Sequence, residues 1–376
     1  MSVYLDCNAT AKVRPEAAAA VARALELGGN PSSVHAAGRA ARAVVEGARA
    51  DVGRLVGVKA ESVVFVSGGT EANALAIESA AQAGFERIVV GATEHDAVLE
   101  NTRSTGLPLE IWPVEANGVA DLGWLADSLA RGPRALVCLM LANNETGVIQ
   151  PVAEAAELVR AAGGWLHVDA VQAAGKIAID FSALGADTMA LSAHKLGGPQ
   201  GVGALVAGPQ ATLSRRLHGG GQERGRRAGT ENTPGIAGFG RAASLALETL
   251  SAMADQAAWR NELATAVTRA GAEVLGAGVP RLPQTLCFAA PGFASELQVM
   301  GLDLAGVMVS AGAACSSGKV KPSRVIEAMG RPDLAPCAIR VSGGWASTAA
   351  DWARCGEAWT EIFARHQARR RAMADA

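Results

Sequence analysis

His95, Asp169 and Lys195 each come at or just after the end of a short apolar run of the chain. Taken one at a time they have simpler explanations: a buried imidazole, a helix cap, and one of six scattered lysines. Together they offer an amine for a Schiff base, a carboxylate for a pyridine nitrogen and a flat ring for stacking. This combination predicts pyridoxal phosphate as cofactor, because a protonated pyridine ring is an electron sink for a substrate carbanion.

A glycine-rich turn supplies the remaining feature that this cofactor needs. The segment "SGGTEAN", residues 67–73, follows an apolar run, and its two glycines permit a tight turn. Thr70 can cap the helix that follows, and the amides of the first helical turn suit a phosphate. Alone, such a turn is more often only the start of a helix. Beside an amine and a carboxylate it predicts a phosphate cradle.

The elements that must position these residues alternate along the chain. Apolar runs and alanine-rich helical stretches follow one another at 62–66 and 70–84, at 134–141 and 152–163, and again at 165–170. This alternation predicts an α/β domain with a doubly wound, mainly parallel sheet. Ligands bind such sheets at the carboxyl ends of the strands. Asp169 and Lys195, 26 positions apart, fit the ends of two neighbouring strands.

The chain changes character from about residue 245. Long helical segments (245–276 and 349–371) flank a few short strands (284–289 and 339–342). We therefore predict a large α/β domain over residues 14–255, and a smaller α+β domain made of residues 1–13 and 256–376.

Composition and charge limit the kinds of molecule that the chain is expected to bind. The 376 residues carry 34 basic and 36 acidic side chains, for a formal net charge of -2, so no strong field favours nucleic acid or an anionic membrane. The chain is 49% hydrophobic, but no apolar stretch approaches the roughly 20 residues of a membrane span. We expect a cytoplasmic protein that acts on a small polar substrate.

The cysteines do not form a metal-binding or disulfide pattern. They stand at positions 7, 138, 287, 315, 337 and 355, without a C-x-x-C pair or zinc-like spacing to histidine. Cys138 and Cys287 lie in apolar runs that predict buried strands. Cys315 lies among alanine, glycine and serine, in a segment that predicts a loop over about residues 309–322 with an accessible thiol.

In their order along the chain, these motifs resemble the cysteine desulfurases, which are pyridoxal-phosphate enzymes of the class-V aminotransferase group. The resemblance is carried by "YLDCNATA", "GNPSSVHAAGR", "SGGTEAN", "TEHDAVL", "NNETGVIQPV", "HVDAVQAAGK", "SAHKLGGPQGVGAL", "GGGQERGRRAGTEN", "SAGAACSSG" and "IRVSGG". It implies the PLP-dependent transferase fold (fold type I) and a homodimer. The "GGGQERGRRAGTEN" segment and the short cysteine loop are most similar to the branch that includes the nitrogen-fixation desulfurases.

The resemblance assigns cofactor roles to residues that match the family's motifs. Lys195 would carry the cofactor as a Schiff base, Asp169 would contact the ring nitrogen, and Gln172 the ring hydroxyl. His95 would stack on the ring and move protons, and Asn144 would also contact the cofactor. The phosphate would bind Gly69, Thr70, Ser192 and His194, with Thr230 reaching in from the second subunit.

The resemblance also implies how L-cysteine would be used. Arg340 would pair with the substrate carboxylate, for which a guanidinium fork is well shaped. Asn8 and Asn30 would lie near the same end of the substrate. Cys315 would take the sulfur as a persulfide, leaving L-alanine, and pass it to an iron–sulfur scaffold or another acceptor protein for cluster assembly. No resident metal is expected, although Cys315 can contact a nascent iron–sulfur cluster.

The chain departs from the family's pattern beside the expected substrate site. Cys7 stands where relatives usually have asparagine, and Ala11 where they usually have threonine. Two alternative functions stay open. One is a selenocysteine lyase or another class-V enzyme on the same frame. The other is a catalytically idle binding subunit, although a binding role does not require the whole set of chemical residues found here.

Overall fold

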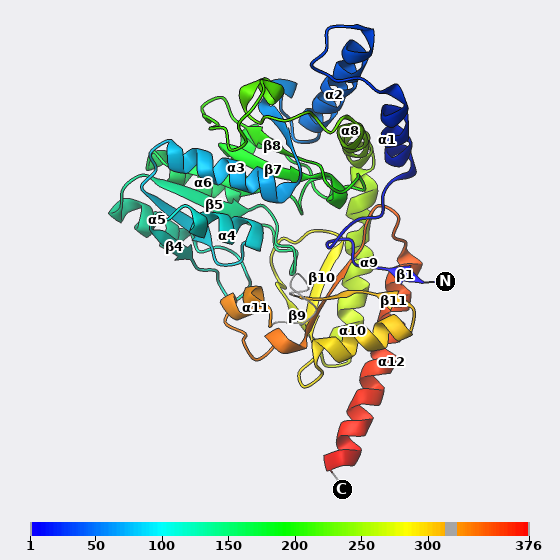
Figure 1. Ribbon diagram of the computed structural model, residues 1–376. Helices are drawn as coiled ribbons and strands as arrows, with labels where there is room; N and C mark the ends of the chain where they lie inside the picture. The colour runs from blue at the N-terminus through cyan, green and yellow to red at the C-terminus, as the bar shows by residue number, and fades with distance from the viewer. Residues whose placement is uncertain (1, 313–321, 375–376) are drawn as a thin grey trace.

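A computed structural model of the chain describes residues 2–312 and 322–374. Figure 1 shows two parts, a large one built on one sheet and a smaller one that contains both ends of the chain. In the described residues, no helix combines the length and the apolar character that crossing a membrane requires.

The large part contains a seven-stranded sheet in the order β2-β8-β7-β6-β5-β3-β4. Its strands are β2 (Val63–Val66), β3 (Arg87–Gly91), β4 (Leu109–Trp112), β5 (Ala135–Met140), β6 (Trp165–Asp169), β7 (Thr188–Ser192) and β8 (Gly203–Ala207). Neighbouring strands run parallel, except that β8 is antiparallel to both β2 and β7. Strands β5 and β7 are buried along their whole length, as strands covered on both faces must be. The predicted mainly parallel, doubly wound sheet is confirmed.

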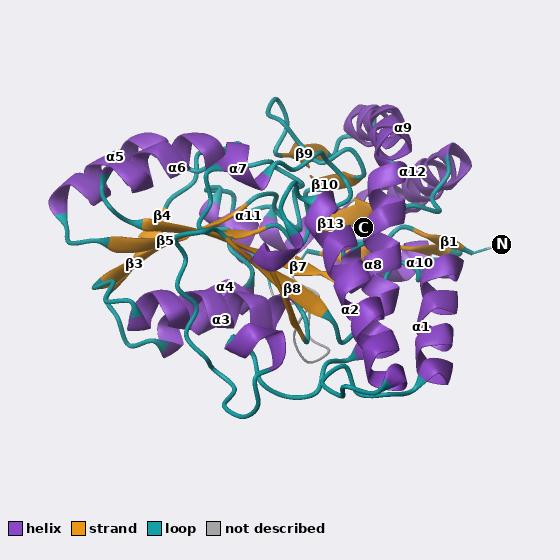
Figure 2. Cartoon of the chain, turned by 90° about the horizontal axis from the view of Figure 1, so that it is seen from above, coloured by secondary structure: helices purple, strands orange, loops and turns teal. Residues whose placement is uncertain are grey.

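Helices cover both faces of this sheet. Figure 2 shows α5, α6 and α7 over one face, and α3 and α4 over the other. Helices α1, α2 and α8 pack against one another beside the sheet. The bounds are α1 (Pro15–Leu27), α2 (Ala36–Leu55), η1 (Ala60–Ser62), α3 (Gly69–Gln82), α4 (Asp96–Ser104), α5 (Leu122–Arg131), α6 (Val152–Ala161), α7 (Phe181–Leu184), η2 (Ala193–Lys195), η3 (Gln222–Gly225) and α8 (Thr233–Glu248).

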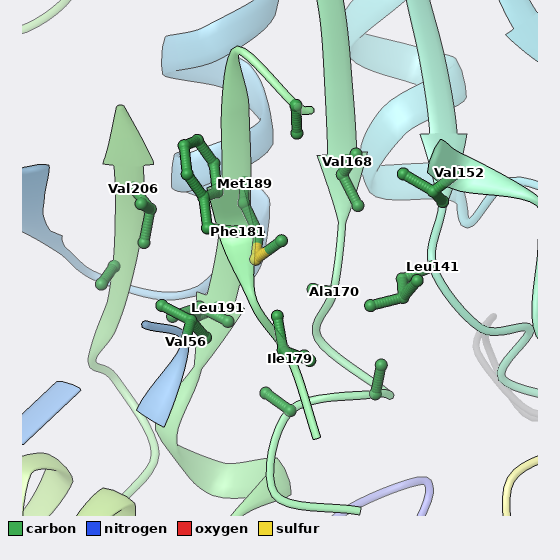
Figure 3. Packing of buried hydrophobic residues seen from close by; sticks show 14 of the residues in the cluster. Val56, Leu141, Val152, Val168, Ala170, Ile179, Phe181, Met189, Leu191 and Val206 are labelled. Atoms are coloured by element: carbon green, nitrogen blue, oxygen red, sulfur yellow. The ribbon is translucent and has the colours of Figure 1, made fainter. Parts of the chain in front are cut away.

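Apolar side chains of the central strands pack against the helices above them. Figure 3 shows Val168 of β6, Met189 of β7 and Val206 of β8 in one cluster with Val152 and Phe181 of α6 and α7. All five side chains are buried. Complete burial of a side chain of this size stabilises the fold by about 1.5–3 kcal/mol. This packing fixes the carboxyl ends of β6 and β7, where the predicted site residues follow.

The smaller part has an antiparallel sheet in the order β12-β13-β10-β9, and a parallel pair, β1 and β11. Its strands are β1 (Val3–Tyr4), β9 (Glu273–Leu275), β10 (Thr285–Ala289), β11 (Val307–Met308), β12 (Ser310–Ala311) and β13 (Ala338–Ser342). Its helices are α9 (Leu250–Arg269), α10 (Ser295–Leu304), α11 (Arg324–Ala328), η4 (Ala335–Cys337) and α12 (Ala349–Ala374). Trp352 and Trp359 of α12 join Phe288 of β10 in a core separate from that of the large sheet.

One predicted element is wrong. Residues 245–276 do not form one helical segment, because α8 and α9 are separate helices and β9 follows α9. Thr249 lies between the helices, and its hydroxyl accepts a hydrogen bond from Nη2 of Arg14 at 3.1 Å. After α9, Gly271 has φ 106°, a left-handed conformation that glycine adopts without strain. The predicted helix over residues 349–371 is confirmed by α12.

The two cores support the proposed division of the chain into residues 14–255 and residues 1–13 with 256–376. Strand β1 pairs with β11 of the smaller part, which ties the N-terminal segment to it. The proposed boundary falls inside α9, whose buried Leu263 and Val267 belong to the smaller core.

Candidate active site

Lys195 follows β7, inside the 3-10 turn η2. Strand β7 runs parallel to β6, whose last residue is Asp169, and the Cα partner of Asp169 is Ala190. The amine of Lys195 donates hydrogen bonds to the backbone oxygens of Asn8 and Ala9, the latter at 2.8 Å. The structure thus brings the predicted cofactor amine and the predicted ring-nitrogen carboxylate to adjacent strand ends, beside the N-terminal segment.

Asn8 links several of the predicted site residues. Its backbone oxygen also accepts a hydrogen bond from Nε2 of Gln172 at 3.0 Å. Its side-chain Nδ2 donates to the backbone oxygen of Asn144 at 3.0 Å, and the same oxygen accepts from Nη1 of Arg340 at 3.1 Å. Asn8, Lys195, Gln172, Asn144 and Arg340 therefore form one set of hydrogen-bonded residues, termed here the Asn8 network.

Arg340 lies on β13 of the smaller sheet, with its side chain only 5% exposed. Its Nη2 pairs with Oδ1 of Asp6 at 2.8 Å. Its Nε has no hydrogen-bond partner within the described residues. Because a buried N–H without a partner is costly, the guanidinium is suited to receive a carboxylate ligand.

The turn before α3 is tight. A Cβ atom on Gly69 would lie 2.8 Å from Cγ2 of Val171 and 3.6 Å from Cβ of Ser192, so a side chain at position 69 would force Val171 to move. Ser192 is buried at the end of β7. Two of the predicted phosphate residues therefore lie side by side at the N-terminus of α3, where backbone amides and the helix dipole favour an anion.

Thr70 does not cap α3, contrary to the sequence prediction. The N-cap is Gly68, and Thr70 is exposed within the first turn. A Cβ atom on Gly203 of β8 would lie 2.6 Å from the carbonyl carbon of Gly68. The close approach of the two backbones, and not a side-chain cap, defines this turn.

Both predicted histidines lie near the site's strand ends. His95 is the N-cap of α4 and is half-buried, and its Nδ1 accepts a hydrogen bond from the backbone N of Ala97 at 3.0 Å. With Nδ1 as an acceptor, a neutral His95 ring carries its proton on Nε2. Nδ1 of His194 lies 3.2 Å from Oγ1 of Thr10. Burial, and then the charge of Lys195, lower the pKa of His194 to about 4, so this ring is neutral at pH 7.

Two buried ionisable residues beside the site were missed from the sequence. Nζ of Lys176 donates to the backbone oxygen of Lys195 at 2.6 Å. Burial, followed by the charge of Lys195, lowers the pKa of Lys176 to about 7. Burial, followed by the charge of Asp169, raises the pKa of Glu94 to about 8. Lys176 lies in the motif "HVDAVQAAGK" and Glu94 in "TEHDAVL", and this position inside the motifs could have indicated that both lie near the site.

Glu145 is a third residue that was missed. Its Oε2 accepts a hydrogen bond from Oγ of Ser323 at 2.5 Å, and a Cβ atom on Gly312 would lie 2.6 Å from the same oxygen. Burial raises the pKa of the Glu145 carboxyl, and the hydrogen bond from Ser323 opposes this shift. One buried carboxyl therefore contacts both residue 312 and residue 323, which come before and after the segment that contains Cys315.

Asn30, Thr230 and Cys315 are the remaining predicted site residues. Asn30 lies on the exposed loop between α1 and α2, where its Oδ1 accepts from the backbone N of Ser32 at 2.9 Å. Thr230 is exposed and lines a cavity of about 190 Å³ together with Ser67. Cys315 lies outside the described residues.

The cysteines predicted to be buried are confirmed. Cys138 on β5 and Cys287 on β10 are 0% exposed, and burial raises the pKa of both thiols. Cys7, beside the N-terminal part of the site, is also buried, and burial raises its pKa to about 11. Thiols in such surroundings stay protonated at neutral pH and are poor nucleophiles.

Residues 3–354 match the family model for Aminotransferase class-V. The chain is 45% identical over 359 residues to the cysteine desulfurase of Cereibacter sphaeroides, covering 93% of this chain and 92% of that protein. It is 37% identical over 360 residues to the cysteine desulfurase IscS of Dictyoglomus turgidum, covering 93% and 91%. The NifS-like protein of Rickettsia africae has the same fold, with a TM-score of 0.89 and 31% identity over 96% of this chain and 99% of that one.

The chain therefore belongs to the class-V aminotransferase family. Within this family the two relatives named above, which match over 93% of the chain, are cysteine desulfurases, and cysteine desulfurase is the function that the sequence motifs predicted. That prediction, and the prediction of the fold, are confirmed.

Proposed function

We propose that this cysteine desulfurase binds pyridoxal phosphate through Lys195, transfers the sulfur of L-cysteine to Cys315, and leaves L-alanine. The Asn8 network is the observation that carries the proposal. It joins a lysine amine from the large sheet to the guanidinium of Arg340 from the smaller sheet. A cofactor on the first and a substrate carboxylate on the second would therefore meet in one place.

The residues around Lys195 fit this cofactor. Oε1 of Gln172 is buried without a hydrogen-bond partner in the described chain, and an amide oxygen is an acceptor for a ring hydroxyl. Gly69 begins α3, and the backbone amides of this first helical turn suit a phosphate. The carboxylate of Asp169 accepts hydrogen bonds from the backbone N of Val171 at 2.9 Å and from Nδ2 of Asn73 at 2.8 Å. A carboxylate held at both oxygens is placed to pair with a protonated ring nitrogen.

Bound pyridoxal phosphate would supply an electron sink that weakens the bond between Cβ and sulfur of the substrate. The chain's own residues would hold and orient the reactants. Arg340 would fix the substrate carboxylate, and His95 would exchange a proton with the substrate carbon. The proposed remaining contacts are Gly69, Thr70, Ser192, His194 and the partner subunit's Thr230 to the phosphate, Asn144 and Gln172 to the ring, and Asn8 and Asn30 to the substrate end.

The sulfur step can be written with its electrons balanced. The thiolate of Cys315 forms a bond to the substrate sulfur, and the bond between that sulfur and Cβ breaks. The electron pair of the broken bond stays with the carbon, which takes up a proton as L-alanine forms. Cys315 keeps the sulfur as a persulfide, which an acceptor protein such as an iron–sulfur scaffold would then receive.

The proposal is tested first at the cofactor. The holoenzyme should bleach on treatment with borohydride and then yield a pyridoxyl-lysine at position 195. Lys195→Ala should yield no such product, whereas Lys12→Ala, at an exposed lysine, should label as the wild type does. Labelling at any other lysine would contradict the assignment.

The substrate is tested by turnover. With a thiol reductant present, L-cysteine should give alanine and sulfide in equal amounts. Alanine release should also rise when an acceptor protein such as an iron–sulfur scaffold takes the persulfide sulfur from Cys315. A selenocysteine lyase on the same frame would turn over selenocysteine while leaving cysteine almost untouched. A catalytically idle subunit would release neither product.

A further inference from the structure

A chain of hydrogen bonds links Asp169 to three buried residues of α3, β6 and β7. Oδ2 of Asp169 accepts from Nδ2 of Asn73 at 2.8 Å. Oδ1 of Asn73 lies 2.9 Å from Nε2 of His167, and Nδ1 of His167 lies 2.9 Å from Oγ1 of Thr188. Asn73, His167 and Thr188 are at most 1% exposed. These three residues and their contacts are termed here the Asp169 relay, and His167 and Thr188 have no part in the chemistry described above.

The strands and one helix create this alignment. Alternate residues of a strand face the same side, so His167 and Asp169 of β6 point to one face of the sheet. Helix α3 packs on β6 and β7 and brings Asn73 onto that face. His167 and Thr188 are Cα partners in the β6–β7 pairing, which places the imidazole beside the hydroxyl.

The donors and acceptors of the Asp169 relay fix the direction of each of its hydrogen bonds. An ionised Asp169 can only accept, so the amide nitrogen of Asn73 faces it and the amide oxygen faces His167. Nε2 of His167 must therefore carry a proton, and Nδ1 then accepts from the hydroxyl of Thr188. Burial lowers the pKa of His167 to about 3, so the ring is neutral and holds the one proton that this arrangement requires.

Other groups near Asp169 do not replace the relay. Its second oxygen, Oδ1, is already held by the backbone N of Val171. Glu94 faces it from the segment between β3 and α4, and burial raises the pKa of Glu94 to about 8, so it is largely protonated at pH 7. Cys138, the β5 partner of His167, is also protonated because burial raises its pKa. The amide of Asn73 is therefore the side-chain donor that the structure places on Asp169.

We propose that Thr188, His167 and Asn73 are positioning residues that orient the Asp169 carboxylate toward the ring nitrogen of the bound cofactor. The inference rests on the proposed function, since it assigns these residues to the same cofactor site. Its consequence is that the hydroxyl of Thr188, two hydrogen-bonded residues removed from Asp169, influences protonation of the cofactor ring.

Thr188→Val is the most informative variant, because valine suits a strand and removes only the hydroxyl donor. Without that donor, His167 can shift its proton to Nδ1, and Asn73 must then turn its oxygen toward Asp169. We expect the Kd for pyridoxal phosphate, measured by titrating the apoenzyme, to rise about tenfold, as for loss of one buried hydrogen-bond partner. The ¹⁵N resonance of labelled cofactor should shift toward the unprotonated ring in the holoenzyme. The matched control Thr188→Ser keeps a hydroxyl and should retain the wild-type Kd within about twofold.

Asn73→Ala removes the donor itself and covers the case in which Thr188→Val fails to fold. It should raise the Kd at least as much as Thr188→Val does, and the double variant should be no worse than Asn73→Ala alone, because the relay is already broken. Equal Kd values and an unchanged ¹⁵N resonance in Thr188→Val and Thr188→Ser would overturn the relay, as would additive losses in the double variant. A wild-type chain that binds no pyridoxal phosphate would instead overturn the proposed function.

Discussion

Two neighbouring buried acids, Asp169 and Glu94, differ in the hydrogen bonds that their carboxyl groups accept. The carboxylate of Asp169 accepts hydrogen bonds at both oxygens, from Val171 and from Asn73. Oε1 of Glu94 accepts from the backbone N of Met140, but its Oε2 has no partner among the described residues. Burial therefore dominates at Glu94, and its carboxyl is largely protonated at pH 7. The two acids therefore differ in how completely their oxygens are hydrogen-bonded.

The Glu94 carboxyl predicts a pH-dependent stability. Because the pKa is about 8 in the folded state and 4.5 ordinarily, the folded chain binds a proton between these values that the unfolded chain does not. The contribution of Glu94 to the free energy of unfolding is therefore fully present below pH 4.5, and it is lost as the pH rises through 8. Glu94→Gln removes this dependence, so its stability relative to the wild type should increase with pH by about 1.4 kcal/mol per unit. Thermal unfolding between pH 5 and 8 measures this, with Glu26→Gln, at an exposed acid, as the control. A constant difference would show that Glu94 is ionised throughout.

Cys315 should be separable from the cofactor chemistry. Cys315→Ala should bind pyridoxal phosphate as the wild type does, because the Asn8 network and Asp169 are untouched. It should release almost no alanine or sulfide, since no thiolate remains to attack the substrate sulfur. Brief exposure of the wild type to L-cysteine should add about 32 Da to the peptide that holds Cys315, as mass spectrometry can detect. Wild-type turnover by Cys315→Ala would move the search to Cys7.

At the level of elements, the 3-10 turn η3 holds an unusual backbone in place. Glu223 and Arg224 have φ values of 46° and 56°, in the left-handed region that residues other than glycine rarely occupy. The buried carboxylate of Glu223 accepts hydrogen bonds from Nη1 and Nη2 of Arg49, at 2.6 and 2.9 Å, and from the backbone N of Phe65 at 2.9 Å. This contact between η3, α2 and β2 offsets the local strain and fixes the segment that leads to Thr230.

Breaking this buried pair should be costly. Glu223→Gln removes the buried counter-charge of the Arg49 guanidinium, so we expect a loss of about 3–5 kcal/mol in the free energy of unfolding. Glu46 provides a matched control, because it also pairs with Arg49, at 3.2 Å, but is 46% exposed. Glu46→Gln should cost about 0–1 kcal/mol. Urea unfolding of both variants makes the comparison, and equal losses would contradict a special role for Glu223.

The elements were largely predictable from the sequence, and the contacts between them were not. Strands β2 and β5 of the large sheet are fully apolar runs, so they stand out even without a partner. At the break between α8 and α9, Thr249 accepts a hydrogen bond from Arg14, 235 positions away, and helix propensity contains no such contact. Glu223 and Lys176 are charged residues, which composition places on the surface, yet both are buried. Glu223 pairs with Arg49, which is distant in sequence, and Lys176 donates to a backbone oxygen. Neither contact can be inferred from the sequence, because both depend on the folded arrangement.

At the scale of the whole molecule, the site lies where the two sheets meet. Lys195 follows a strand of the large sheet, Arg340 lies on the smaller sheet, and Asn8 bridges them from the N-terminal segment. The side chain of Asn8 also donates to Oγ1 of Thr285 on β10 at 3.0 Å. A shift of the smaller part relative to the larger would therefore change the distance between cofactor and substrate carboxylate.

Thr230 can serve the site of its own chain or the site of a partner subunit. Within one chain it lines a cavity of about 190 Å³ with Ser67, which comes just before the glycine turn. The neighbouring Arg227 pairs with Glu71 of α3 at 2.9 Å. The segment therefore lies close to the glycine turn of its own chain, at the start of α3, although the family resemblance assigns Thr230 to the site of a second subunit. Exposure of Thr230 in the isolated chain is compatible with the second arrangement.

Mixed dimers decide between these arrangements. Thr230→Ala alone should weaken cofactor retention in either case, because a phosphate contact is lost. A dimer of one Lys195→Ala chain and one Thr230→Ala chain contains, if Thr230 acts across the interface, one site with an intact Lys195 and an intact Thr230 of the partner subunit. Co-expression with two different affinity tags and sequential purification would isolate that dimer, whose activity should be about half that of the wild type, since one of two sites is whole. If Thr230 serves its own chain, both sites of the mixed dimer are damaged, and its activity should not exceed half that of the Thr230→Ala homodimer. A chain that sediments as a monomer while fully loaded and active would exclude the shared site altogether.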